Sequence, residues 1–133
     1  MSHFSKIKTS ITDSKVLKKT LNDLSFVHKS FFEDNNIASD SSLDRKEIIF
    51  VYDSYISESL LPCCSFEWND NEYVIVVDLS LWNLDIDFHY FTERLLQQYA
   101  YNIVIDQGYN EGFHCIDEKV YDNGSISLIL QKF

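Results

Sequence analysis

The sequence predicts an α+β protein in which one short and one long helix pack on an antiparallel sheet of about five to six strands. Three features support this fold class. Apolar residues recur at helical spacing between Asp87 and Glu111, segments of alternating polarity lie on both sides of that stretch, and a strong turn signal, Asn123-Gly124, lies near the end. The resulting order is strand, helix, strands, hairpin, long helix, hairpin. Helices set among antiparallel strands in this way are typical of α+β domains.

The long helix is predicted from Asp87 to Glu111. Its large apolar residues are three or four positions apart and therefore share one face of a helix: Phe88, Phe91, Leu95, Tyr99 and Ile103. Gly112 follows the stretch, where a residue of left-handed conformation commonly ends a helix. The β-branched run Ile103-Val104-Ile105 and Gly108 both disfavour a helix. Because the apolar face continues through the run, we expect one continuous helix.

Five segments precede the first predicted hairpin. Alternating polarity predicts a strand over His3–Ile11, and helical spacing predicts a short first helix over Ser14–Leu24 with lysines on its outer side. We expect a brief strand over Ser25–Phe32 and a longer one over Lys46–Tyr52. The polar stretch at about 33–45, rich in Asn, Asp and Ser, predicts a mobile loop between them.

Two pairs of strands flank the long helix. Residues 64–68 and 73–79 form the first pair, and the second of these strands is apolar on both faces, which predicts an interior position in the sheet. Residues Cys115–Val120 and Ser125–Leu130 form the second pair. Between them, Asn123-Gly124 predicts a type I′ hairpin turn because both residues tolerate positive φ.

Composition limits the class of protein. An apolar content of 45% across 133 residues is enough for one core, so we expect a single domain over residues 1–133. The formal net charge is −10, with twelve acidic and three basic residues in the second half, 64–133. This acidity predicts repulsion of nucleic acids. The longest apolar run is far shorter than the ~20 residues of a membrane-spanning helix, so no membrane insertion is expected.

The cysteines give no pattern typical of a disulfide framework or a metal site. There are three, two of them adjacent at Cys63-Cys64, and none are paired with the C-x2-C spacing of structural zinc sites. We therefore expect a reducing compartment, free thiols, and no bound metal or cofactor.

Several stretches carry a resemblance to a known family: Met1-Ser2-His3-Phe4-Ser5, Asp78-Leu79-Ser80-Leu81-Trp82, Tyr99-Ala100-Tyr101, Gly112-Phe113 and Asn123-Gly124-Ser125. In these the chain resembles the hypothetical chloroplast open reading frame thirty-five family, found in red-algal plastid genomes and cyanobacteria and without an established activity. The resemblance runs nearly end to end, with residues 29–46 matching poorly. It implies a plastid-encoded protein of the chloroplast stroma and supplies no catalytic residues.

The candidate site lies in the connection before the long helix. Its members are the acidic and aromatic side chains of residues 78–87, with one helix tyrosine beside them: Asp78, Ser80, Trp82, Asp85, Asp87 and Tyr101. The three carboxylates could hold a hydrated magnesium ion, which needs only one or two of them. The aromatic side chains could line a ligand or partner surface. The competing interpretation is turn and N-cap chemistry, for which Asp is well suited.

No stretch specifies a reaction, so the residues favour a non-enzymatic role. We expect a factor for assembly or regulation that binds another protein, whose identity the sequence leaves open together with the oligomeric state. The alternative is an enzyme, or a small-ligand or magnesium-binding protein, that uses the acidic and aromatic connection 78–87. A second alternative is nucleic-acid binding through the basic N-terminal helix, because the first 29 residues hold six lysines and two aspartates.

Overall fold

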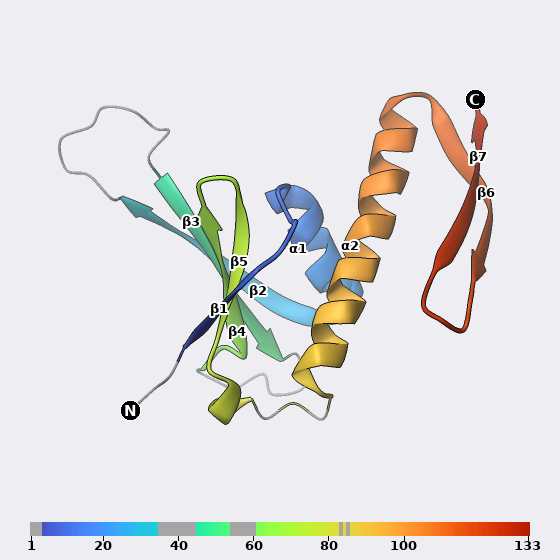
Figure 1. Cartoon of the computed structure of the whole chain (residues 1–133). Helices are drawn as coiled ribbons and strands as arrows, with labels where there is room; N and C mark the ends of the chain where they lie inside the picture. The colour runs from blue at the N-terminus through green and yellow to red at the C-terminus, as the bar shows by residue number, and fades with distance from the viewer. Residues whose placement is uncertain (1–3, 35–44, 54–60, 83, 85) are drawn as a thin grey trace. The chain divides into compact units, whose positions relative to one another are not determined.

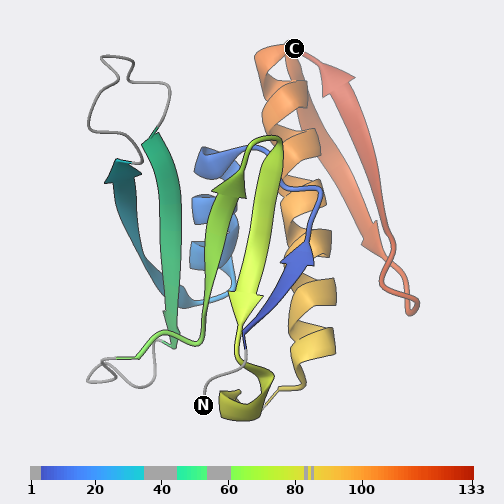
Figure 2. The same ribbon diagram turned by 60° about the vertical axis from the view of Figure 1, so that its left-hand side comes forward.

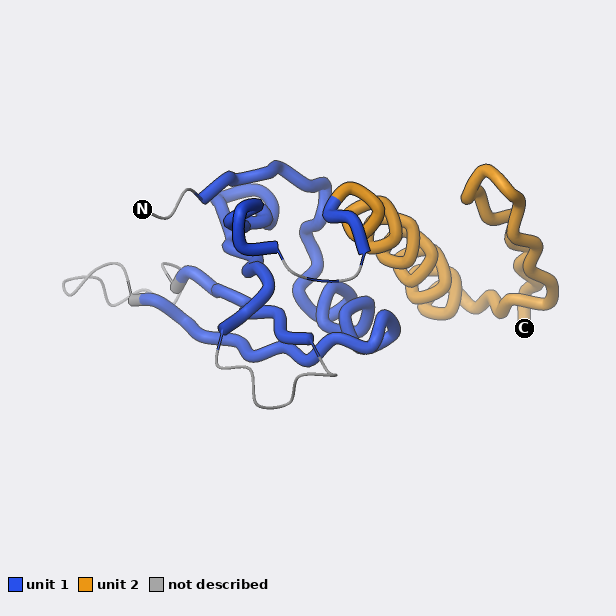
Figure 3. The backbone as a smooth tube through the Cα atoms, turned by 90° about the horizontal axis from the view of Figure 1, so that it is seen from below, with its two compact units in different colours: residues 1–88 blue, residues 89–133 orange. Residues whose placement is uncertain are grey.

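The predicted α+β class is confirmed in the computed structural model, which describes residues 4–34, 45–53, 61–82, 84 and 86–133. These residues form a five-stranded antiparallel sheet, a separate two-stranded sheet, one short α-helix and one long α-helix (Figure 1). The chain divides into two compact units, residues 1–88 and 89–133 (Figure 3). The prediction of one domain over residues 1–133 stays a prediction, and most of the predicted loop at 33–45 lies outside the described residues.

Unit 1 contains the five-stranded sheet, in the order β1-β5-β4-β3-β2 with every neighbour antiparallel (Figures 1 and 2). The strands are β1 (Ser5–Lys8), β2 (Phe26–Asp34), β3 (Arg45–Asp53), β4 (Cys64–Asn69) and β5 (Glu72–Val77). Strand β5 lies inside the sheet, as its two apolar faces predict. The β2–β3 pair is longer than expected, since Asp34 pairs with Arg45 and Glu33 with Lys46.

The core of unit 1 forms between helix α1 (Ser14–Asp23) and one face of the sheet. The helix begins where Asp13 caps it, with its Oδ1 accepting the Val16 N–H at 3.0 Å. Its buried residues recur at helical spacing: Val16, Leu17, Thr20 and Leu21. On the sheet, Ile49, Phe66 and Ile75 stand opposite one another across three strands, each at most 1% exposed. The alternation of each strand thus places one apolar row on the buried face.

Unit 2 contains nearly all of helix α2 (Phe88–Asn110), together with β6 (Phe113–Val120) and β7 (Ile126–Lys132). The helix runs through Ile103-Val104-Ile105, which confirms the prediction of one continuous helix. Gly112 follows its end with φ +89°, the left-handed conformation expected there. No helix among the described residues is long and apolar enough to span a bilayer.

Gly108 lies where helix α2 packs against strand β7. It is buried, and a Cβ built there would lie 3.1 Å from Leu130 Cδ1 of β7. Because a side chain at this position would push against Leu130, the helix backbone itself forms the contact with the hairpin. The close packing of Leu130 against the helix backbone therefore offsets the unfavourable helix propensity of glycine at this position.

Strands β6 and β7 form a hairpin of their own; among the described residues they pair only with each other. One prediction about this hairpin is wrong. The turn is not type I′, because Gly124 has φ +89° while Asn123 is not among the residues with positive φ. Instead, Val120 pairs with Ile126, and a five-residue connection is closed by a bond from the Gly124 N–H to the Tyr121 carbonyl at 3.0 Å. Longer hairpin connections are commonly built around such a turn.

We predict that Leu21→Ala destabilises unit 1 by about 2–5 kcal/mol, because it removes a fully buried side chain and leaves a cavity beneath α1. Urea unfolding monitored by circular dichroism measures the difference. Lys19→Ala, an exposed position of the same helix, serves as the control and should change stability by no more than about 0.5 kcal/mol. Equal effects of the two substitutions would contradict the placement of the core.

Candidate functional site

Asp78 and Ser80, two of the predicted site residues, bond to each other. Asp78 is 7% exposed and lies between β5 and the short 3-10 helix η2 (Leu79–Leu81). Its Oδ1 accepts the backbone N–H of Ser80 at 3.1 Å and the Ser80 hydroxyl at 2.6 Å. This is N-cap geometry, in which the carboxylate satisfies the first free N–H of a helical turn. The contacts of these two residues therefore fit the turn and cap interpretation.

Trp82 also contacts residues close to it in the sequence, Ile86 and Phe88. Its indole N–H donates to the Ile86 carbonyl at 2.8 Å, and its ring meets the Phe88 ring edge-on with centroids 5.1 Å apart. Asp87 is exposed and immediately precedes the first residue of α2, the N-cap position. Asp85 lies outside the described residues, so the grouping of the three carboxylates stays a prediction.

A half-buried polar cluster around Glu47 joins α1 to the sheet of unit 1, and it was not predicted from the sequence. The Glu47 carboxylate accepts the Tyr73 hydroxyl at 2.9 Å and the Ser14 hydroxyl at 3.0 and 3.1 Å. The Lys18 ammonium lies 2.8 Å from its Oε1, and the Glu47 side chain is only 13% exposed. A charge so far removed from water is stable only when it is paired and hydrogen-bonded, as here.

Titration in this cluster follows from those contacts. Burial by itself raises the pKa of Glu47, but the hydrogen bonds from Lys18, Tyr73 and Ser14 and the Lys18 charge outweigh it and hold the pKa below its ordinary value. Burial, together with the Glu47 carboxylate, raises the pKa of Tyr73 to about 12. Glu47 therefore stays ionised and Tyr73 protonated at neutral pH, the states that the bonds require.

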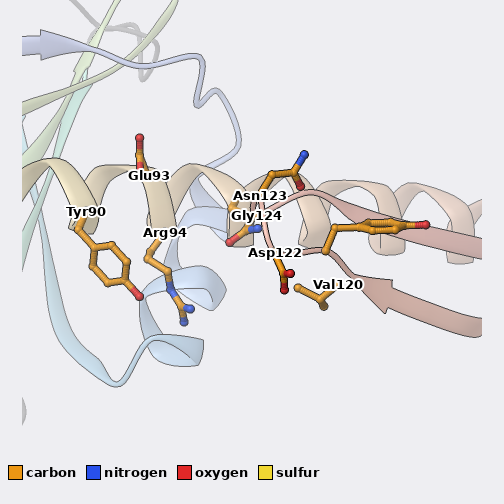
Figure 4. A pocket seen from close by; sticks show the side chains of 9 residues that line it. Tyr90, Glu93, Arg94, Val120, Asp122, Asn123 and Gly124 are labelled. Atoms are coloured by element: carbon orange, nitrogen blue, oxygen red, sulfur yellow. The ribbon is translucent and has the colours of Figure 1, made fainter.

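Unit 2 has a groove on its surface (Figure 4). It has a volume of about 480 Å³ and lies between the first turns of α2 and the β6–β7 connection. Its lining combines tyrosines, charged groups and the hairpin turn: Tyr90, Glu93, Arg94, Gln97, Val120, Tyr121, Asp122, Asn123 and Gly124. A second hollow of about 320 Å³ shares Arg94, Gln97 and Val120 with it. We call the two hollows together the α2–hairpin groove.

Arg94 and two tyrosines, Tyr90 and Tyr121, are the side chains of this groove that are suited to contact a partner. Tyr90 and Arg94 extend from the same side of α2, one turn apart, whereas Glu93 extends from the other side (Figure 4). Tyr90 is 49% and Tyr121 45% exposed. No hydrogen bond or ion pair joins Arg94 to another residue in the described part of the chain. The Arg94 guanidinium is therefore available to donate hydrogen bonds to an anionic group of a partner.

Tyr101 is the predicted site residue that lies in this groove. It lines the second hollow, and its hydroxyl donates to the Glu118 Oε2 of β6 at 2.7 Å. Sequence reasoning missed Tyr90, Arg94 and Tyr121. A signal for the first two was present, because an arginine and a tyrosine four residues apart must share one side of the predicted helix. The position of Tyr121 depends on how the hairpin folds back along α2.

The cysteines are free thiols in the structure. Cys64 is buried, and Cys63 and Cys115 are half-buried. Burial raises the pKa of both Cys63 and Cys64, so neither thiol ionises readily at neutral pH. Within the described ranges, no three or more His, Cys, Asp or Glu side chains are grouped so as to hold a metal ion.

Comparisons with known proteins give consistent results. Residues 55–129 match the family model described as "Protein of unknown function (DUF1257)". Relatives called "Uncharacterized protein ycf35" include that of Guillardia theta, 37% identical, and that of Pyropia yezoensis, 34% identical, each covering 100% of this chain and 98% of the relative. The ycf35 protein of Cyanophora paradoxa is 29% identical with the same coverage. No solved structure matches the chain.

We predict that Glu47→Gln lowers the stability of unit 1 by about 1–3 kcal/mol at neutral pH, because hydrogen bonds to a charged group are replaced by neutral ones. The folded-state pKa of Glu47 lies below the ordinary 4.5, so its contribution is present above that pH and is lost as the pH falls through the lowered pKa. The difference between the two proteins should therefore shrink in acid.

Urea unfolding at several pH values measures this difference. Glu111→Gln, which removes an exposed carboxylate, is the control and should show little effect at any pH. A wild-type advantage that persists unchanged in strong acid would contradict the role given to the Glu47 charge.

Proposed function

The chain belongs to the ycf35 family, and we propose that it is a non-enzymatic protein of the plastid stroma that binds another protein in assembly or regulation. The plastid assignment rests on its relatives, whose ycf35 name denotes plastid-encoded proteins. The binding role rests on the α2–hairpin groove.

The composition of the groove supports protein binding. Tyrosine and arginine are enriched in the buried centres of protein interfaces, where a few such residues carry most of the binding free energy. Tyr90, Arg94 and Tyr121 all line the groove, with the 62%-exposed Val120 among them. An interface here would bury large side chains that now contact water.

The charges of the groove indicate the chemistry of the partner. The Arg94 guanidinium is suited to a carboxylate, with which it forms two parallel hydrogen bonds. Val120 and the ring of Tyr121, over which the Lys119 ammonium lies at 5.1 Å, present apolar surface next to it. Glu93 and Asp122 on the same lining repel carboxylates, so only the position next to the Arg94 guanidinium suits one. The fitting partner segment therefore has one acidic residue beside an apolar side chain.

The two other functional classes receive less support from the contacts. In the connection 78–87, Asp78 bonds Ser80 and Trp82 bonds Ile86, so these polar groups are already used locally. In the basic N-terminal helix, the Lys18 charge is paired with Glu47. Neither arrangement adds an observation that favours a ligand or nucleic acid.

We predict that Arg94→Glu abolishes partner binding, because it places a carboxylate where the proposed ion pair with the partner's carboxylate needs a guanidinium. Tagged wild-type and variant proteins are used to capture partners from a plastid extract, and the proteins retained are quantified by mass spectrometry. The partner should be retained by the wild type and lost from the variant.

Lys132→Glu is the matched control. It makes the same change of charge at an exposed position of unit 2 that lines neither hollow, so it should retain the partner as the wild type does. If the wild type retains no specific protein, or if Arg94→Glu retains the same proteins in equal amount, the proposed function is wrong.

A further inference from the structure

Strand β2 is an edge strand with unusual features. It runs for nine residues, pairs along its whole length with β3, and pairs with no other described strand on its outer side (Figure 2). Three of its large apolar side chains are exposed: Val27 by 46%, Phe31 by 53% and Phe32 by 59%. Long apolar edge strands offer a row of free N–H and C=O groups to another strand.

The opposite edge of the same sheet is protected. Strand β1 has only four residues, and two of them are exposed lysines, Lys6 and Lys8. Short edge strands with lysine are a common way in which proteins prevent strand addition. The β2 edge differs from it in being long and in exposing apolar side chains.

The sequence of β2 is complementary to itself. If two copies of β2 are set antiparallel with Phe31 opposite its own equivalent, Lys29 stands opposite Glu33 and Glu33 opposite Lys29. Both are exposed and lie on the same face of the sheet as Phe31, because alternate residues share a face. Moving the centre by one residue, to Ser30, instead places Lys29 opposite Phe31 and removes both charge pairs.

We propose that the β2 edge is a dimer interface, at which a second copy of this chain adds its own β2 in that register. The two five-stranded sheets then continue into one another across a two-fold axis. Phe31 already meets Phe50 edge-on at 5.5 Å, and Lys29 lies 5.4 Å from the centre of the Tyr52 ring. The dimer extends this aromatic row across the axis and flanks it with two Lys29–Glu33 pairs.

A charge exchange tests the register. Lys29→Glu places Glu opposite Glu at two symmetric positions, and Glu33→Lys places Lys opposite Lys, so each should weaken dimerisation by about tenfold. The double variant with both changes restores opposite charges and should dimerise as the wild type does. Sedimentation velocity from micromolar to submillimolar concentration measures the dissociation constants, and circular dichroism verifies that each variant is folded.

Two controls separate this interface from other effects. Lys8→Glu makes the same charge change on β1, and Arg94→Glu alters the α2–hairpin groove; both should leave the dimer unchanged. A wild type that is monomeric throughout, a dimer insensitive to both single changes, or a double variant no better than the singles would each overturn the proposal. A foreign strand that binds monomeric wild type would likewise exclude a second copy as the occupant.

Discussion

The attachment of α1 to the sheet of unit 1 depends on a half-buried carboxylate and the groups that neutralise it. Glu47 lies on the sheet face that carries the apolar core, where an isolated charge would be costly. Lys18 and Ser14 reach it from α1, and Tyr73 reaches it from β5. The polar contact therefore fixes the position of the helix, while Leu17 and Leu21 supply the apolar burial. Hydrophobic packing does not by itself fix the orientation of α1, because it is non-directional. The hydrogen bonds of Glu47 are directional and therefore orient the helix on the sheet.

Unit 2 meets a different constraint, because a two-stranded hairpin is at best marginally stable in water. Helix α2 supplies the packing surface that the isolated hairpin lacks. Gly108 lets Leu130 of β7 approach the helix backbone, and Tyr101 donates a hydrogen bond to Glu118 of β6. These contacts lie along α2 and hold the hairpin beside it, and the groove is the space that remains towards the turn. The proposed binding surface is thus a consequence of how the hairpin is supported.

The two edges of the larger sheet show how one fold can both avoid and permit association. A protein with a net charge of −10 resists non-specific association. Lysines on the short β1 give further protection at one edge, while β2 presents apolar residues between a lysine and a glutamate. General repulsion and a specific, self-matched edge are compatible, because the pairing depends on close opposite charges and the repulsion on the whole surface.

Elements whose signals are local could be predicted from the residues alone. The long helix was predicted through Ile103-Val104-Ile105 because the apolar face continues there, and Gly112 was predicted to end it because only a left-handed residue suits that position. The tertiary structure was needed to establish which strands pair and that β6 and β7 form their own sheet. It was needed equally to show that Lys18 meets Glu47 and that Tyr121 lines one groove with Tyr90 and Arg94. Periodicity and capping act between residues within a few turns of chain, whereas strand pairing and ion pairs between elements depend on residues far apart in sequence.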